Sequence, residues 1–563
     1  MDNTLRIRSK RKDIRNDPEV IPYVLFFGIL ILFNIIMMLR HEAWRDEAQA
    51  WLMAKQLSPI SLLDELSYEG HPCLWFYLLM PFAKAGLPFV TLNIVSIVVM
   101  AVVIVLIGAA APFDRISRML FAASPLCIYA FSAISRSYCL VALLLVLLAM
   151  ADRRRYEHPV SFCILIALLV QTHIVMIGMC FALCACHFFG SIFLYRRKKG
   201  AGEADAGKTF AANAASLLIP LASAIFLLYE FRDVGNAASV GSGEKAATFM
   251  GLVGDMVAAA KTCLVFLFTN FRFEAAACIL LFVIAAVIFD VRLARGVIVC
   301  AVAMAFQLYV YAEVWGVSNY RHLLWLWQFF WFFWIAKDCM DQRRNLIETR
   351  LGENQLGGAQ SDEEQSGEIQ MDDVQSCEDY SCDRVEKTKV RPLKRKHRIL
   401  YMPACMLLSL AIVTTCLASS WALIDDIKAD YDGLYTDAQG AADFLEALPE
   451  DAVIFEGSGE FCNSVVARLV TKKAYSAFYE QEAGFCIRNK TRFKDLDYAG
   501  FEKAARKMFP KAEGVYVFFS DTSPEGCMGN IVGYPKEYTE VYATETETIR
   551  DEGYRIVYVP FAK

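Results

Sequence analysis

An acidic pair, Asp46-Glu47, follows the first long apolar run of the chain, within a polar stretch at 41–74. Charged side chains beside an apolar run are costly unless they stay hydrated or serve a function. A carboxylate there suits general base catalysis, in which it takes a proton from an attacking hydroxyl. We predict Asp46 as the base and Glu47 as a supporting hydrogen-bond acceptor or the partner of Arg45. The plain alternative is a solvated charged turn.

A histidine stands at the end of the same stretch, immediately before Pro72. Proline favours the first turn of a helix, and the N-terminus of a helix attracts anions. We therefore predict that His71 contacts a phosphate group and that Glu69 orients its ring. The alternative is a histidine packed or hydrated at a membrane interface.

Further cationic residues are expected on the same side of the membrane. Arg136, two residues before Tyr138, lies between two short apolar runs, and Arg321-His322 begins a later one. Arginine binds phosphate through its forked donors, which makes these residues candidate phosphate ligands. The alternative for Arg136 is a long side chain that only reaches toward the interface.

The elements that must position these residues are apolar helices. The chain has 563 residues, of which 56% are hydrophobic, and the excess lies in separate runs. Runs of this kind predict a multi-pass α-helical membrane protein with about eleven spans. The predicted spans are 21–39, 90–111, 118–134, 138–151, 159–173, 174–194, 209–229, 274–290, 296–312, 321–337 and 399–420. Basic clusters fall on alternate connections, which predicts a cytoplasmic N-terminus and an extracytoplasmic C-terminus.

The chain divides into segments of distinct composition. We predict a basic cytoplasmic N-terminus at 1–19, a transmembrane catalytic domain at 20–340, a disordered acidic cytoplasmic loop at 341–398, a last span at 399–420 and a small extracytoplasmic α/β domain at 421–563. The first outer loop covers 40–89, and its apolar part at 72–87 is short enough to predict an interfacial helix. A second outer stretch at 230–273 predicts either a loop with an interfacial helix or a lid over a lipid cavity.

The remaining composition excludes several classes of site. The 18 cysteines show neither metal-ligand spacing nor a disulfide framework. The formal net charge of −5 averages two opposed populations, and we expect no nucleic-acid partner.

Taken together, these motifs resemble the GT-C superfamily of integral membrane glycosyltransferases. The nearest likeness is to the branch of protein O-mannosyltransferases and the lipid A aminoarabinose transferase, related to glycosyltransferase family 39. The matching segments are Arg45-Asp46-Glu47-Ala48, His71-Pro72-Cys73-Leu74-Trp75, Ser124-Pro125, Arg136-Ser137-Tyr138 and Arg321-His322-Leu323-Leu324. They extend over roughly residues 20–340. The sequence departs from the family pattern where His71 replaces a lysine and Cys73 replaces a second proline.

The resemblance implies a polyprenyl-phosphate sugar donor, inverting transfer, and a glycan, lipid or protein acceptor, on the outer face of the bacterial cytoplasmic membrane. It leaves a divalent metal shared by Asp46 and Glu47 as an open alternative, although no further ligand set is visible. Two other functions compete with this one. The chain could transport or flip lipid-linked glycans, or it could be a non-catalytic anchor for the C-terminal domain. Scarce mid-span charges and the lack of inverted repeats disfavour the transporter.

Overall fold

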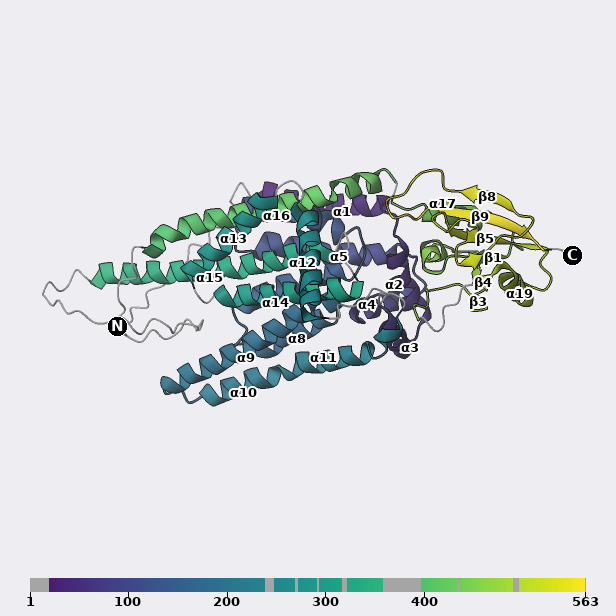
Figure 1. Cartoon of the computed structure of the whole chain (residues 1–563). Coiled ribbons are helices and arrows are strands. Elements are labelled where there is room, and N and C mark those ends of the chain that lie inside the picture. The colour runs from purple at the N-terminus through teal and green to yellow at the C-terminus, as the bar shows by residue number, and fades with distance from the viewer. Residues whose placement is uncertain are drawn as a thin grey trace.

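The computed structural model describes residues 20–237, 248–268, 272–290, 293–315, 321–357, 396–433, 435–489 and 496–561. The predicted basic segment at 1–19 lies outside these residues. An elongated bundle of helices forms one end of the molecule, and a smaller domain with a β-sheet forms the other (Figure 1). The bundle contains α1 (Val20–Arg40), α5 (Thr91–Ala110), α6 (Arg115–Ala122), α7 (Tyr138–Asp152), α8 (Pro159–Val170), α9 (Ile177–Gly200), α10 (Ala206–Ser216), α11 (Leu218–Glu230), α12 (Phe249–Phe268), α13 (Arg272–Phe289), α14 (Ala294–Val310), α15 (Leu324–Gly357) and α16 (Lys396–Tyr431).

Six helical segments in the described part of the chain are long and apolar enough to cross a membrane. They are Val20–Arg40, Thr91–Ala110, Ile174–Gly200, Ala206–Asn236, Ala294–Val314 and Tyr401–Ser420. Shorter apolar helices cover Tyr138–Asp152, Pro159–Val170 and Ile279–Ile288. The chain is therefore a mostly helical protein with membrane-spanning character, and the count of about eleven spans stays a prediction.

Two predicted boundaries differ from the structure. The expected span at 118–134 is not one helix, because α6 ends at Ala122 and Pro125 precedes a separate turn of π-helix at Leu126–Ala130. Proline lacks the amide hydrogen that would continue the first helix. In addition, α15 continues to Gly357, so the helix takes up the first part of the loop predicted at 341–398. Residues 358–395 lie outside the described chain.

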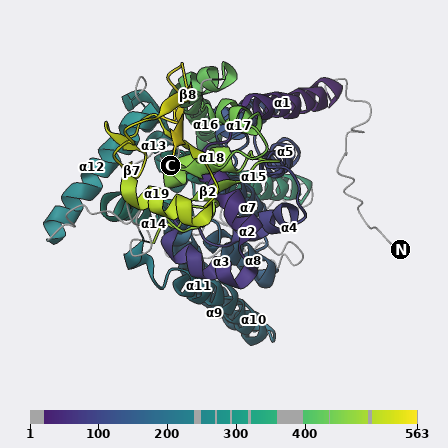
Figure 2. The ribbon, with the colours of Figure 1, turned by 90° about the vertical axis from the view of Figure 1, so that its right-hand side faces the viewer.

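Short helices cover the end of the bundle that faces the C-terminal domain. They are α2 (Arg45–Gln56), α3 (Pro59–Glu65) and α4 (Leu74–Lys84). The predicted interfacial helix at 72–87 corresponds to α4, which has only 11 residues. In Figures 1 and 2, α12 runs across the long axis of the bundle, unlike its neighbours. Its crosswise direction agrees better with a helix at a membrane surface than with a span.

The C-terminal domain is built on a six-stranded mixed sheet, in the order β3-β2-β1-β5-β9-β8. Its strands are β1 (Ile454–Glu456), β2 (Ala474–Ser476), β3 (Gln481–Glu482), β5 (Gly514–Ser520), β8 (Thr539–Ala543) and β9 (Tyr554–Pro560). The central strand β5 pairs parallel with β1 and antiparallel with β9. A second, three-stranded sheet joins β4 (Leu496–Asp497), β7 (Ile531–Val532) and β6 (Cys527–Met528).

Helices cover both faces of the six-stranded sheet. Phe501 and Ala505 of α19 (Tyr498–Met508) pack with Val517 of β5 on one face. On the other face, residues of α17 (Ala438–Glu446) and α18 (Asn463–Val466) pack with Phe518 of the same strand. Neighbouring residues of β5 point to opposite faces, and the buried pattern of its last four residues reflects this two-sided cover. The predicted small α/β domain is thus a sheet between two layers of helices.

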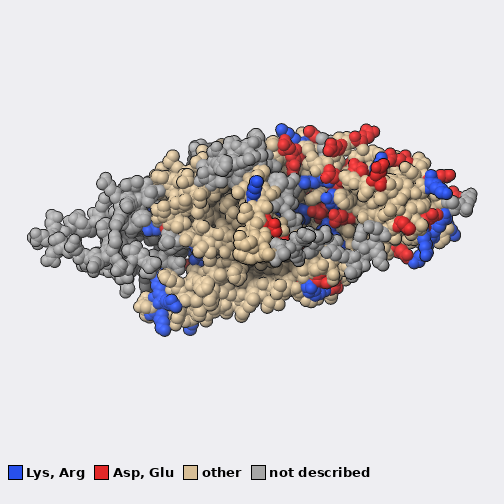
Figure 3. All heavy atoms as spheres, in the orientation of Figure 1, with Lys and Arg blue, Asp and Glu red and all other residues tan. Residues whose placement is uncertain are grey.

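Charge is distributed unevenly over the surface. Figure 3 shows acidic and basic side chains gathered on the C-terminal domain, while the described surface of the bundle is largely uncharged. The last turn of α9, which in Figure 1 points away from the C-terminal domain, carries three successive basic residues, Arg197, Lys198 and Lys199. An uncharged belt between two charged ends is typical of a protein that crosses a membrane.

Candidate active site

Asp46 lies in the first turn of α2, where the N-terminus of the helix favours a negative charge. Its Oδ2 accepts a hydrogen bond of 2.5 Å from Nη1 of Arg136. Its Oδ1 lies 3.3 Å from Nη2 of Arg488, in the C-terminal domain. Burial would raise the pKa of Asp46, but Arg136, Arg488, Arg45 and Arg321 outweigh it and hold the pKa well below its usual range. Asp46 is therefore ionised at neutral pH, with both carboxylate oxygens engaged by cations.

His71 faces Asp46 across Arg136. Nη2 of Arg136 donates to Nε2 of His71 over 2.6 Å, and Oγ of Ser137 lies 3.4 Å from Nδ1. Burial, together with the charges of His173, Arg136 and Arg321, keeps the pKa of His71 well below its ordinary value. A neutral His71 that accepts from Arg136 supplies no positive charge, so this geometry disfavours it as a cationic phosphate ligand and gives it an orienting role.

Aromatic rings support this part of the site. The ring of Tyr138 stacks on His173 at 5.2 Å, and His173 meets His71 edge-on at 4.6 Å. The guanidinium of Arg136 lies over Tyr138, 5.6 Å from the ring centre. Tyr138, a predicted site residue, therefore packs against Arg136, His71 and His173 behind the residues that line the cavity.

Glu69 does not orient His71 as predicted; it contacts the C-terminal domain instead. Its Oε2 accepts from Nη1 of Arg488 at 2.9 Å, and its Oε1 accepts from Nε2 of Gln49 at 2.8 Å. Burial raises the pKa of Glu69, while Arg488 and Gln49 oppose that rise. Arg488 also bonds Glu460 through Nε at 3.1 Å, so one guanidinium joins three carboxylates.

Glu47 points away from Asp46 into a separate cluster. It is fully buried and contacts Nε2 of His41 at 2.9 Å and the backbone N–H of Ser135 at 2.5 Å. Nδ1 of His41 contacts Asp430 at 2.8 Å. Glu47 is thus a hydrogen-bond acceptor and not the partner of Arg45. Arg45 instead contacts Glu552 and lies near Glu460.

The two carboxylates cannot share a metal ion, because they face in different directions. Asp46 is engaged by two arginines and Glu47 by His41 and backbone amides. Among the residues that the structure describes, no group of three His, Cys, Asp or Glu side chains could hold a metal ion. The open alternative of a shared divalent metal therefore does not fit this arrangement.

Arg321 lies close enough for its charge to lower the pKa values of Asp46 and His71. Its carbonyl accepts from the hydroxyl of Tyr311 at 3.0 Å. The next residue, His322, is buried, with 1% of its surface exposed, and does not line the cavity beside Asp46. Arg321 therefore acts on Asp46 and His71 through its charge, although neither Arg321 nor His322 lines the cavity.

A small cavity lies in the middle of these residues; its empty volume, including the part open to solvent, is about 320 Å³. Its lining comes from α2, from α4 and the segment before it, from the segment before α7 and from the C-terminal domain: Asp46, Gln49, Ala50, Glu69, His71, Trp75, Phe76, Arg136, Ser137 and Arg488. Charged groups thus face an aromatic wall, which suits a ligand with both a charged and an apolar part.

The sequence prediction missed Arg488 and Gln49. Oε1 of Gln49 accepts from Nδ2 of Asn463 at 2.7 Å and from the backbone N–H of Cys486 at 2.8 Å, which fixes the loop that carries Arg488. No motif marks Arg488, because its contact with Asp46 joins residues 442 positions apart. Arg488 could have been found only by predicting that the C-terminal domain covers Asp46.

No family model matches the sequence, and neither the curated proteins nor the solved structures contain a match. The resemblance to GT-C glycosyltransferases therefore rests on the motifs quoted above and stays a prediction.

Proposed function

We propose that the protein is a membrane glycosyltransferase that moves a sugar from a polyprenyl-phosphate donor to an acceptor hydroxyl. The observation that carries this proposal is the carboxylate of Asp46 between Arg136 and Arg488 beside a partly aromatic cavity. Transfer from a lipid phosphate requires a base for the acceptor and cations for the leaving phosphate. Both kinds of group occur here within hydrogen-bond distance of each other.

In the proposed reaction, the acceptor oxygen attacks the anomeric carbon of the sugar while Asp46 takes the hydroxyl proton. The bond between that carbon and the phosphate oxygen breaks, and its electrons leave with the polyprenyl phosphate. Inversion at the anomeric carbon follows from a single displacement, as the family resemblance implies. Arg136 and Arg488 neutralise the phosphate, with Arg321 as a third cation nearby.

The ion pairs of Asp46 have a consequence for this mechanism. A carboxylate held by two guanidiniums is a weak base, because its pKa is depressed. An incoming phosphate competes for the same guanidiniums, and its negative charge raises the pKa of Asp46. We infer that donor binding itself activates the base, so that Asp46 becomes basic only when a sugar is in place to be transferred.

The proposed topology has about eleven spans, a cytoplasmic N-terminus and an extracytoplasmic C-terminal domain in the cell membrane. It is supported by the basic last turn of α9 at the end of the bundle opposite the candidate site. Under this topology, the cavity lies at the outer surface, where the head group of a lipid donor and an acceptor can meet.

The test is turnover by the purified full chain in detergent against a panel of polyprenyl-phosphate sugars. We expect release of polyprenyl phosphate together with a glycosylated product of inverted anomeric configuration. Movement of intact donor across vesicle membranes without release would instead establish the transporter. Full biological function of the isolated segment 421–563 would establish the anchor, and either result would refute the enzyme.

A further inference from the structure

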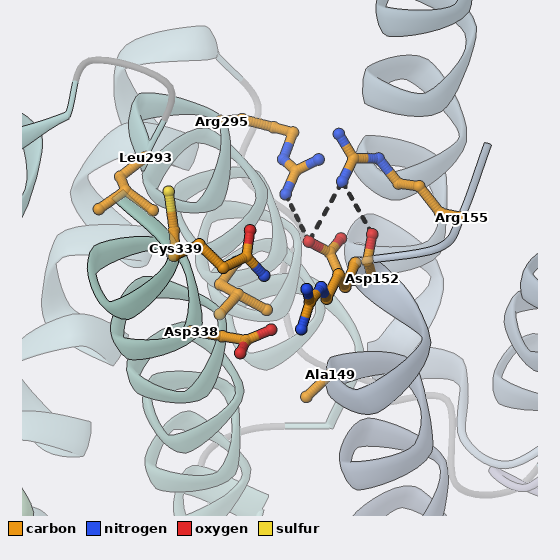
Figure 4. Close-up of a pocket in the computed structure, with 10 residues that line it drawn as sticks. Ala149, Asp152, Arg155, Leu293, Arg295, Asp338 and Cys339 are labelled. Carbon is orange, nitrogen blue, oxygen red and sulfur yellow. Dashed lines mark hydrogen bonds and ion pairs between the residues drawn. The ribbon is translucent and has the colours of Figure 1, made fainter. Parts of the chain in front are cut away.

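A second cavity lies at the far end of α7, which begins beside the candidate active site at Tyr138 and ends at Asp152. Figure 4 shows its lining residues. It is formed by the end of α7, the start of α14 and residues 335–342 of α15, and its empty volume, including the part open to solvent, is about 530 Å³. Its lining comprises Ala149, Asp152, Arg153, Arg155, Leu293, Arg295, Ile335, Asp338, Cys339 and Gln342. None of these residues takes part in the proposed reaction.

Positive charge exceeds negative charge around this cavity. Nη2 of Arg295 and Nη1 of Arg155 both contact Oδ2 of Asp152, at 2.7 and 3.2 Å, as the dashed lines in Figure 4 show. One carboxylate therefore serves two guanidiniums. Arg153 adds a third cation, and Asp338 is the other acidic residue of the lining. Burial raises the pKa of Asp338, although Arg153 opposes this rise. Asp338 is therefore less able to balance the remaining positive charge.

Two buried polar atoms at this cavity have no hydrogen-bond partner within the described residues. They are Nε of Arg155, a residue only 8% exposed, and Oε1 of Gln342. Buried polar atoms are usually paired, so an unpaired donor and an unpaired acceptor at one cavity require an explanation. An anion would satisfy the donor of Arg155, and a hydroxyl group would satisfy the acceptor of Gln342.

The position of the cavity indicates where such a ligand would come from. The apolar helix Tyr138–Asp152 ends at Asp152, and the apolar segment Ala294–Val314 starts one position before Arg295. Lipid head groups lie at the level where apolar helices end, and basic pockets between helices bind anionic head groups. Leu293 and Ile335 give the same cavity an apolar wall.

We propose that this cavity binds a phosphate anion that carries a hydroxyl group, of the glycerol phosphate class. Both an anionic phospholipid head group and a free glycerol phosphate have this chemistry. The guanidiniums of Arg153, Arg155 and Arg295 hold the phosphate, and Gln342 accepts from the hydroxyl. The competing view is that the arginines only connect α7 to α14 through Asp152.

The test uses the full chain in nanodiscs of phosphatidylcholine with or without phosphatidylglycerol. We expect phosphatidylglycerol to raise the thermal midpoint and to be retained when the complex is analysed by native mass spectrometry. Arg153→Gln leaves both contacts of Asp152 intact and should weaken retention about fivefold, the contribution of one surface cation. Its matched control is Arg154→Gln, an exposed neighbour paired with Glu157, which should leave retention unchanged.

A separate arm adds soluble glycerol 3-phosphate to nanodiscs of phosphatidylcholine alone. A rise in midpoint that Arg153→Gln reduces would support the site and assign it to the free anion. Arg295→Gln should lower binding further, but it also removes a contact of Asp152, so Arg153→Gln remains the deciding variant. Equal retention by the wild type and the Arg153→Gln and Arg154→Gln variants, with no response to glycerol 3-phosphate, would overturn the proposal.

Discussion

The two faces of α2 hold adjacent carboxylates in opposite surroundings. Asp46 faces a cavity, and its side chain keeps 21% of its surface exposed between arginines from two distant segments. Glu47 is buried and accepts hydrogen bonds from His41 and from the backbone N–H groups of Ser135 and Trp44. Neighbouring residues on a helix point about 100° apart, so one acidic pair can supply both a reactive group and a framework group. Asp46 and Glu47 carry the same charge, so the difference between a reactive role and a structural role comes from the cavity, which only Asp46 lines.

The largest expected effect is on turnover. Asp46→Asn keeps the shape of the side chain but removes the base, and we expect kcat to fall by about 10²–10⁴-fold. The thermal midpoint should fall as well, because Arg136 loses its ion pair with Asp46, while Arg488 keeps its contacts with Glu69 and Glu460. A wild-type kcat in a folded Asp46→Asn protein would show that Asp46 is not the catalytic base.

Glu47→Gln should act on stability instead. The change leaves the buried His41 cation with Asp430 as its remaining carboxylate contact in the described chain, and we expect a loss of about 3 kcal/mol in the free energy of unfolding. The control is Asp64→Asn, since the exposed pair of Asp64 with Arg232 should contribute below about 1 kcal/mol. Thermal unfolding in detergent measures both. A Glu47→Gln protein that is stable but inactive would place Glu47 in the reaction.

A pH series sharpens the comparison further. Burial disfavours the charged form of His41, but Asp430 and Glu47 outweigh it and raise its pKa to about 10. The folded-state pKa lies above the unfolded value of 6.5. The contribution of His41 to stability is therefore fully present below pH 6.5 and is lost as the pH rises toward 10. We expect a loss of about 2 kcal/mol between pH 7 and pH 9 from this group.

His41→Gln should remove this pH-dependent part, so the difference in midpoint between wild type and variant should shrink from pH 7 to pH 9. A difference that stays constant over that range would show that His41 does not carry the charge inferred from its surroundings.

The smallest expected effect concerns the cation that the C-terminal domain contributes. Arg488→Gln should raise the KM for the donor about tenfold and leave the KM for the acceptor unchanged, because one of several phosphate contacts is lost. Arg506→Gln is the matched control on the same domain, where Arg506 pairs with Glu502 within α19. Equal changes for donor and acceptor would mean that Arg488 only fastens the domain to the bundle.

Periodicity and composition were sufficient to predict the strongly patterned elements. The apolar runs predicted at 21–39 and 90–111 match α1 and α5 to within one residue at each end, and the short helix predicted within 72–87 is α4. The break at Pro125 was missed, because the apolar run continues through it.

The site was predictable only in part. Local motifs marked Asp46, Glu69, His71 and Arg136, which all line the cavity. They could not assign partners, so Glu69 was matched with His71 and not with Arg488. Pairing across hundreds of residues depends on how the sheet domain docks on α2, and no local pattern encodes that docking.

The contact between Arg488 and Asp46 also determines when, during synthesis of the chain, the cavity can be completed. Asp46 is synthesised 442 residues before Arg488. The helices of the bundle are therefore made before Asp46 can form its contact with Arg488. Until the C-terminal domain has been synthesised and has docked, the cavity lacks Arg488. Under the proposed function, a chain that ends before the C-terminal domain would therefore bind the donor more weakly, because its cavity lacks Arg488.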